Sequence, residues 1–209
     1  MKLIFLHGLG QSPSSWNEIL ISLPKHIEPL CPSLFGLLED GEISYERMYT
    51  ALEKYIEEFS EPVNLCGISL GAVLALNYTI DHIEKVSSLV LIAPQYKMPK
   101  LLLKIQNMVF HVMPEHSFSK SGLKKSDMIQ LTKSMAPLNF QKDLHKITCP
   151  SFIICGERDK ANRKAAKALV NLIPGAGFGL IDSTGHEVNV EAPYKLSNEI
   201  GLFYKHMKK

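Results

Sequence analysis

The sequence predicts an α/β protein, a three-layer α/β/α sandwich around a mostly parallel sheet of about six strands. Short apolar runs alternate with segments in which apolar residues recur every three or four positions, which predicts buried strands alternating with amphipathic helices. The chain has 209 residues, of which 45% are hydrophobic and 21% charged, as expected for a single globular domain over residues 1–209. Residues 97–146 contain no convincing strand and interrupt the alternation, so we expect a helical lid or cap inserted within that domain.

The strands are predicted from short apolar runs that end at glycine, proline or polar residues. The first run ends at His7-Gly8, and the third leads directly into Gly67. Runs without polar alternation are typical of strands buried on both faces, as in a parallel sheet covered by two layers of helices. The predicted strands are residues 2–6, 27–31, 63–66, 86–93, 151–155 and 178–181.

Helices are predicted where apolar residues follow the helical period. Residues 44–59 show this period most clearly, Ser44 can cap the helix, and Pro62 ends it. The first helix of the insertion has Pro99 in its first turn and Pro114 just beyond its end. The predicted helices are residues 14–23, 44–59, 70–80, 98–113, 126–135, 161–173 and 192–206.

Charge and composition narrow the class of function. A net charge of +2 does not indicate binding to nucleic acid or to an anionic membrane. No apolar run approaches the roughly 18 residues of a membrane span or the roughly 7–15 of a secretory signal. The four cysteines lack CxxC spacing, and Cys66 and Cys155, which lie inside apolar runs, are expected to be buried free thiols. We therefore expect a cytoplasmic monomer or homodimer that acts on a small molecule, without cofactor, metal, nucleic acid or membrane.

The segment Gly67-Ile68-Ser69-Leu70-Gly71 has the Gly-x-Ser-x-Gly pattern of a nucleophile elbow. Such an elbow joins a strand to a helix, and the predicted strand 63–66 and helix 70–80 flank this segment. Glycines on either side of the serine leave room where two backbones pass closely. Ser69 is the candidate nucleophile, and the alternative is a glycine-rich turn with a bystander serine.

A serine hydroxyl needs a base, and the base needs a carboxylate. His186 follows the last predicted strand, and Asp159 follows strand 151–155, so both lie where a doubly wound sheet places active groups. Glu157 is the rival acid, and Asp182 is a poorer one. Asp159 could instead cap the helix that begins near Ala161, and we expect one role to exclude the other. His186 could likewise be an ordinary surface histidine.

The oxyanion formed by attack on an ester needs two N–H donors. We expect one from Leu70, the residue after the nucleophile, and one from Leu9, in the loop after the first strand. Alternatively, His7-Gly8-Leu9-Gly10 is merely a flexible turn. A dinucleotide-binding loop is not supported, because position 13 is proline where the third glycine would stand.

With these segments the chain resembles the α/β-hydrolase superfamily over nearly its whole length. The resemblance is carried by residues 6–10 with Trp16 shortly after, by the elbow at 67–71, by Gly156-Glu157-Arg158-Asp159 and by Gly185-His186. It implies the triad Ser69, Asp159 and His186, an oxyanion hole at Leu9 and Leu70, and a cap over the pocket. Members of the superfamily usually open with an antiparallel hairpin; without it, all strands should be parallel.

The function expected from these residues is hydrolysis of a carboxylic ester or thioester of a small, apolar acyl substrate through an acyl-enzyme on Ser69. Alternatives on the same triad are carbon–carbon bond hydrolysis, acyl transfer or a lyase reaction. A ligand-binding signalling protein of the same fold with little turnover is an alternative of a different class. The fold by itself does not distinguish them.

Overall fold

The computed structural model describes residues 1–38, 41–115 and 123–207, except for the side chains of residues 100–102 and 104–106. Within these residues the strands form one six-stranded sheet in the order β2-β1-β3-β4-β5-β6, and every pairing is parallel. The predicted α/β class and the all-parallel sheet are confirmed. The strands are β1 (Lys2–Leu6), β2 (Glu28–Leu30), β3 (Val63–Ile68), β4 (Val86–Ile92), β5 (Ser151–Gly156) and β6 (Gly177–Ile181).

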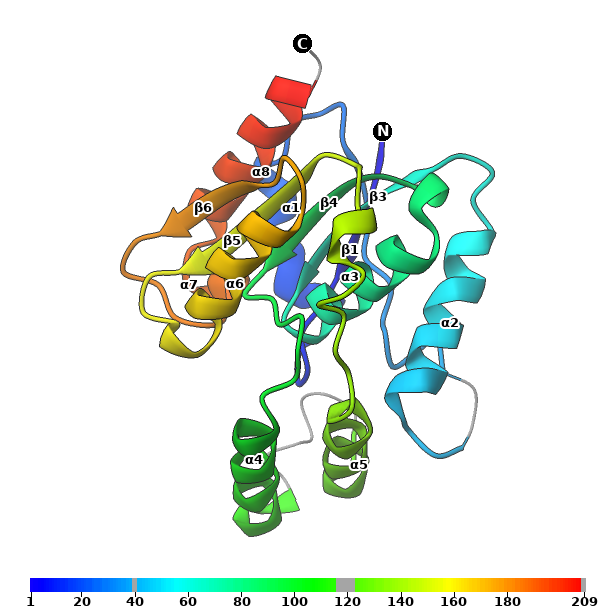
Figure 1. The fold of residues 1–209 in the computed structure, drawn as a ribbon, viewed down its shortest axis with the longest axis vertical. Helices are drawn as coiled ribbons and strands as arrows, with labels where there is room; N and C mark the ends of the chain where they lie inside the picture. The colour runs from blue at the N-terminus through cyan, green and yellow to red at the C-terminus, as the bar shows by residue number, and fades with distance from the viewer. Residues whose placement is uncertain (39–40, 116–122, 208–209) are drawn as a thin grey trace.

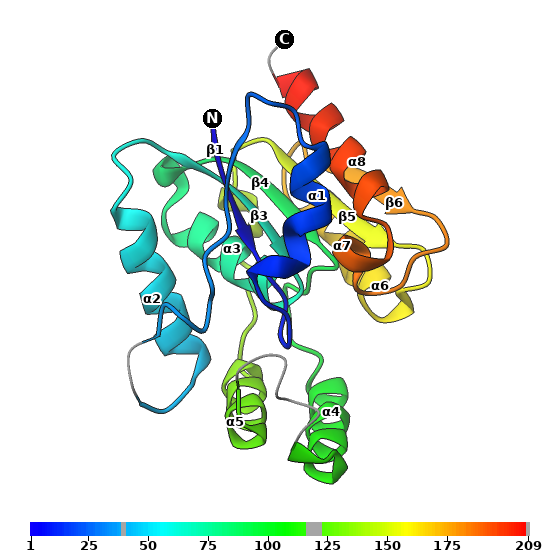
Figure 2. The same ribbon diagram turned by 180° about the vertical axis from the view of Figure 1, so that it is seen from behind.

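Helices cover both faces of the sheet (Figures 1 and 2). One layer holds α2 (Tyr45–Glu57), α3 (Leu70–Asp81) and α6 (Lys160–Leu172). The other holds α1 (Asn17–Ser22) and α8 (Pro193–Met207), with the short α7 (Val188–Glu191) before α8. The structure differs from the predicted helices in two places. A 3₁₀ turn at Pro13–Trp16 replaces the start of the first helix, and α7 has too few residues to show a period in the sequence.

Successive strand residues face opposite layers, which explains the uninterrupted apolar runs. In β1, Ile4 and Leu6 join the core cluster under α2, α3 and α6, whereas Leu3 and Phe5 join the cluster under α1 and α8. All four side chains are fully buried. Because both sets are buried, neither face of a central strand needs polar residues.

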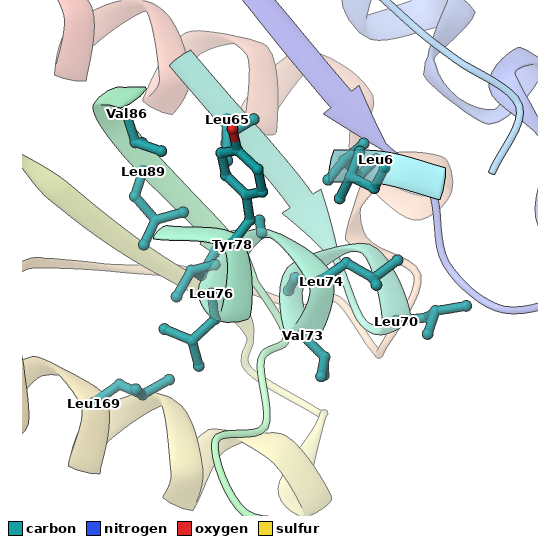
Figure 3. Close-up of a cluster of buried hydrophobic side chains, with 14 of the residues drawn as sticks. Leu6, Leu65, Leu70, Val73, Leu74, Leu76, Tyr78, Val86, Leu89 and Leu169 are labelled. Carbon is teal, nitrogen blue, oxygen red and sulfur yellow. The ribbon is translucent and has the colours of Figure 1, made fainter. Parts of the chain in front are cut away.

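Helix α3 lies at the centre of its layer and is apolar nearly all round, as expected for a buried helix. Leu74 and Leu76 have no exposed surface, and Tyr78 is almost fully buried. Figure 3 shows these side chains with those of the sheet beneath them, including Leu65 and Leu89. Each buried leucine stabilises the fold by about 1.5–3 kcal/mol, so α3 and the elbow before it are firmly held.

The insertion lies between β4 and β5 and extends beyond the carboxyl ends of the strands (Figures 1 and 2). Its helices are α4 (Lys100–Val112) and α5 (Lys125–Met135), close to the predicted ranges, and a 3₁₀ turn at Leu144–Lys146 ends it. The segments leading to and from the helices meet in an antiparallel bridge between Lys97 and Asn139. In the described part of the chain, no helix has the length and apolar character needed to cross a membrane.

Candidate active site

Ser69 stands between the end of β3 and the start of α3 in a conformation that side chains rarely adopt. Its φ is 52° and its ψ is −112°, which places it in a strained region for a residue with a Cβ. The backbone is held by the Ser69 N–H, which donates to the Ile92 carbonyl at 3.0 Å, and by the Val73 N–H, which donates to the Ser69 carbonyl at 3.0 Å. The fold therefore imposes this turn and presents the Ser69 side chain at the edge of the sheet.

The two glycines of the elbow are required by close backbone contacts. A Cβ on Gly67 would lie 2.2 Å from the Gly71 carbonyl oxygen, and one on Gly71 would lie 2.1 Å from the Leu6 carbonyl oxygen. Real Cβ atoms do not approach this closely, so only glycine fits at either position. The close backbone contacts expected around a Gly-x-Ser-x-Gly elbow are therefore present.

His186, in the loop after β6, lies between Ser69 and Asp159. Its Nε2 is 3.0 Å from the Ser69 Oγ, and its Nδ1 is 2.8 Å from the Asp159 Oδ2. A carboxylate only accepts hydrogen bonds, so Nδ1 carries the ring proton and Nε2 is free to accept the hydroxyl proton. The His186 side chain is 44% exposed and that of Asp159 only 5%, so the hydroxyl end is accessible and the acid end is enclosed. The structure brings the three predicted residues together.

Asp159 corrects one expectation, because it caps a helix and contacts the histidine at the same time. Its side chain caps α6, with Oδ1 accepting the Asn162 backbone N–H at 3.2 Å, while Oδ2 faces His186. The Asn162 side-chain amide also donates to Oδ1 at 2.9 Å and to Oδ2 at 2.8 Å. A carboxylate has two oxygens, so the two roles do not exclude each other.

These donors keep the Asp159 carboxylate ionised despite its enclosure. Burial alone would raise its pKa, but the hydrogen bonds from His186 and Asn162 outweigh burial and lower it. An ionised acid at this position stabilises the cationic form of the histidine when the ring takes a second proton.

The rival acids contact other groups. The Glu157 carboxylate accepts the Ser183 backbone N–H at 2.8 Å, which ties the loop after β5 to the loop after β6. Asp182 pairs with Lys195 at 2.9 Å, and its side chain is exposed. In the part of the chain that the structure describes, neither carboxylate contacts His186.

A cavity of about 400 Å³ opens over Ser69, and most of its wall is apolar. Its lining comes both from the loops at the strand ends and from residues of the insertion, so the insertion contributes directly to the cavity. Leu9 and Leu70, the predicted oxyanion donors, both border it. The lining residues are Leu9, Ser69, Leu70, Val73, Ala93, Gln95, Met98, Pro99, Leu103, Thr132, Met135, Asp159, Ala161, Asn162 and His186.

His7 is fully buried beneath the loop after β1 and is a structural group rather than a second base. Its Nε2 accepts the Leu34 backbone N–H at 3.1 Å, so the ring proton is on Nδ1, which donates to the Gly8 carbonyl at 3.0 Å. Burial lowers its pKa, which keeps the ring neutral. The loop after β1 is therefore held in place and is not the flexible turn considered from the sequence.

Asn162 and Gln95 are site residues that the sequence analysis missed. Gln95 follows β4 and donates from Nε2 to the Asn162 Oδ1 at 2.8 Å, and both side chains border the cavity. A signal for Asn162 was present, because it lies three residues after the capping Asp159, where side chains commonly return to the cap. Gln95 had no comparable signal.

The profile of the Alpha/beta hydrolase family matches residues 3–199 of the chain. The chain belongs to this family. The matched region contains the elbow, the three loops that carry Leu9, Asp159 and His186, and the insertion.

Among curated relatives, the alpha/beta hydrolase chain is similar to monoacylglycerol lipase abhd6-A of Xenopus laevis, with 22% identity over 93% of this chain and 72% of that protein. Among solved structures it is similar to MenH from S. aureus, with a TM-score of 0.84, 20% identity, and coverage of 100% of this chain and 95% of that one. It is also similar to an esterase from Thermogutta terrifontis, with a TM-score of 0.79, 16% identity, and coverage of 99% and 90%. At these identities the structures show a shared fold.

No metal site is formed by the described residues of this alpha/beta hydrolase, since they contain no group of three or more His, Cys, Asp or Glu side chains placed to hold an ion. The loop after β1 lies against the nucleophile, because a Cβ on Gly8 would be 3.6 Å from the Ser69 Cβ. That loop therefore borders the same site as Ser69.

Proposed function

We propose that the chain is a serine hydrolase that cleaves a carboxylic ester or thioester of a small, apolar acyl substrate through an acyl-enzyme on Ser69. The observation that carries the proposal is the continuous contact from the Ser69 Oγ through His186 to Asp159, at 3.0 and 2.8 Å, in the wall of a mostly apolar cavity. These are the positions required of a nucleophile, a base and an orienting acid.

In the acylation step, the Ser69 Oγ attacks the substrate carbonyl carbon while the His186 Nε2 takes the hydroxyl proton. The new C–O bond forms, and the carbonyl electron pair moves onto oxygen to give a tetrahedral oxyanion. When the carbonyl re-forms, the bond to the leaving alcohol or thiol breaks, and the imidazolium of His186 returns its proton to that group. Asp159 holds the ring and stabilises its positive charge throughout.

In the deacylation step, water takes the place of the leaving group. His186 removes a proton from the water as it attacks the acyl carbon, and a second tetrahedral oxyanion forms. Collapse of this intermediate breaks the bond to Ser69 and releases the carboxylic acid. The Ser69 Oγ recovers its proton from His186, which restores the starting state.

The backbone N–H groups of Leu9 and Leu70 are proposed to stabilise both oxyanions. Leu70 is the first residue of α3, where the helix leaves its N–H without an intrahelical acceptor and directs its positive end toward the site. Leu9 borders the same cavity from the opposite loop. Removing one such donor typically costs about 10²–10³-fold in rate, so these groups are central to the proposal.

The proposal is tested with p-nitrophenyl esters of increasing acyl length, assayed with the wild-type protein and with Ser69→Ala. We expect turnover of short to medium acyl chains by the wild type, because the cavity above Ser69 is apolar and limited in volume, and none above background with Ser69→Ala. Binding of the esters without turnover across the whole series would contradict the proposal and support a ligand-binding role.

A further inference from the structure

Two loops that carry the proposed machinery are joined by a reciprocal pair of side-chain amides. Gln11 follows β1, and Asn189 lies in α7, just after His186. The Gln11 Nε2 donates to the Asn189 Oδ1 at 3.2 Å, and the Asn189 Nδ2 donates to the Gln11 Oε1 at 3.2 Å. The Gln11 Nε2 also donates to the Glu187 Oε1 at 3.0 Å. The pair links residues 178 positions apart in the chain.

Asn189 is the buried member of this pair and also contacts the 3₁₀ turn at Pro13–Trp16. It is only 1% exposed, and its Nδ2 also contacts the Ser15 carbonyl oxygen at 3.3 Å. A buried amide is costly unless its donors and acceptors have partners, so Asn189 holds Gln11 firmly. Gln11 itself is only partly buried, which makes it the part of the pair that can be replaced without opening the core.

Gln11 forms hydrogen bonds with Gly8 through both its side chain and its backbone. The Gly8 N–H donates to the Gln11 Oε1 at 3.1 Å, and the Gln11 N–H donates to the Gly8 carbonyl at 3.1 Å. A Cβ on Gly8 would lie 3.3 Å from the Gln11 Oε1 and 3.6 Å from the Ser69 Cβ. The Gly8 backbone is therefore held between the Gln11 amide and the nucleophile.

The peptide group that follows Gly8 carries the Leu9 N–H. Its carbonyl oxygen accepts two hydrogen bonds, from the His7 Nδ1 at 3.0 Å and from the Gln11 N–H at 3.1 Å. The described part of the chain has no cis peptide bonds, and in a planar trans peptide the N–H points opposite to the C=O. Holding the Gly8 carbonyl in this way directs the Leu9 N–H away from His7 and Gln11.

We infer that Gln11 is a positioning residue for a pre-aligned oxyanion donor. Its backbone N–H holds the Gly8 carbonyl, and its side-chain amide holds the Gly8 N–H at the other end of the same residue. Together these contacts fix the Gly8–Leu9 peptide, and the side chain ties it to the loop of His186. The inference rests on the proposed function, since it assigns a task to the oxyanion loop of that site. An N–H that is already aligned costs no reorganisation when negative charge develops, and this is the source of its catalytic effect. Gln11 acts through Leu9 and is not itself required to touch the substrate.

The test compares Gln11→Met with the wild type, because methionine keeps the length of the side chain and the backbone bond to the Gly8 carbonyl. It removes only the amide that accepts the Gly8 N–H and joins Asn189 and Glu187. We expect kcat for a p-nitrophenyl ester to fall by about 10- to 100-fold while KM stays within about threefold. Affinity for an alkyl boronic acid, whose tetrahedral adduct with serine places an oxygen in the oxyanion site, should fall in parallel. Ser14→Ala is the matched control, because Ser14 lies in the 3₁₀ turn just after Gln11 and its exposed hydroxyl bonds, among the described residues, to Ser12. This variant should match the wild type.

A second variant combines Gln11→Glu with Glu187→Gln, which keeps an acceptor for the Gly8 N–H and avoids placing two carboxylates 3.0 Å apart. It should retain more of the wild-type kcat than Gln11→Met. Wild-type kcat and boronate affinity in Gln11→Met, or a raised KM with unchanged kcat, would overturn the inference. Failure of the proposed function is distinguished by the wild-type protein, which would then show no turnover at all.

Discussion

At the scale of single residues, Asp159 shows how one carboxylate links a fold element to the proposed chemistry. One oxygen caps α6 and the other holds the His186 ring, while Asn162 donates to both. The rigid end of a helix thereby sets the position of the acid, and the acid sets the tautomer of the base. The backbone of α6 thus fixes Asp159, Asp159 fixes the His186 ring, and that ring contacts the Ser69 hydroxyl.

The role of Asp159 predicts a large effect of Asp159→Asn on turnover. The asparagine side chain can offer an N–H to the His186 Nδ1, which favours the wrong tautomer, and we expect kcat for an ester to fall by about 10⁴-fold. Glu157→Gln is the control, because the amide oxygen can still accept the Ser183 N–H, and its kcat should stay near that of the wild type. A small loss in Asp159→Asn together with a large loss in Glu157→Gln would move the role to Glu157.

At the scale of elements, the strand β3, the elbow and α3 act as one unit. The strained φ of Ser69 is sustained because β4 and α3 hold its backbone on either side and α3 is buried along nearly its whole length. Backbone strain of this kind costs on the order of 1–3 kcal/mol, which the packing of the helix can offset. The same unit contacts the end of β1, because Gly71 at the start of α3 lies directly against the Leu6 carbonyl.

The close contact predicts opposite effects of adding a methyl group to two helical glycines. In Gly71→Ala the Cβ would lie 2.1 Å from the Leu6 carbonyl oxygen, so β1 and α3 must separate, and we expect a loss of about 3 kcal/mol or more in unfolding free energy. In Gly201→Ala the Cβ meets Pro24 at 3.4 Å, an ordinary contact, and helix propensity should add up to about 1 kcal/mol. Urea denaturation measures both, and equal shifts of the two midpoints would contradict this account.

At the scale of the whole molecule, the parallel sheet explains why so much of the candidate site was predictable from the sequence. Ser69, Asp159 and His186 were each found because they follow predicted strands, and parallel strands bring their carboxyl ends to one edge of a sheet. Local patterns sufficed for the strands, the elbow and most helices. The positions of these three residues at the strand ends are shown by the structure, whereas their roles as nucleophile, acid and base are part of the proposed function.

The parts of the site that could not be predicted from the sequence depend on contacts between residues far apart in the chain. The Gln11–Asn189 pair joins opposite ends of the chain, and α7, which carries Asn189, is too short for a helical period. The two simultaneous contacts of Asp159 depend on where the loop after β6 places His186, which no local pattern around Asp159 encodes. The cavity wall combines loops from the sheet with residues of the insertion, so its shape follows only from the assembled fold.

The assignment of Ser69 as the nucleophile is tested by labelling the intact protein with a fluorophosphonate and mapping the modified peptide by mass spectrometry. The reagent phosphonylates a serine only where a base activates the hydroxyl, and here the His186 Nε2 lies 3.0 Å from the Ser69 Oγ. We expect a single adduct on Ser69 that is lost in Ser69→Ala. An adduct on another serine, or an unlabelled Ser69 in a folded protein, would contradict this assignment.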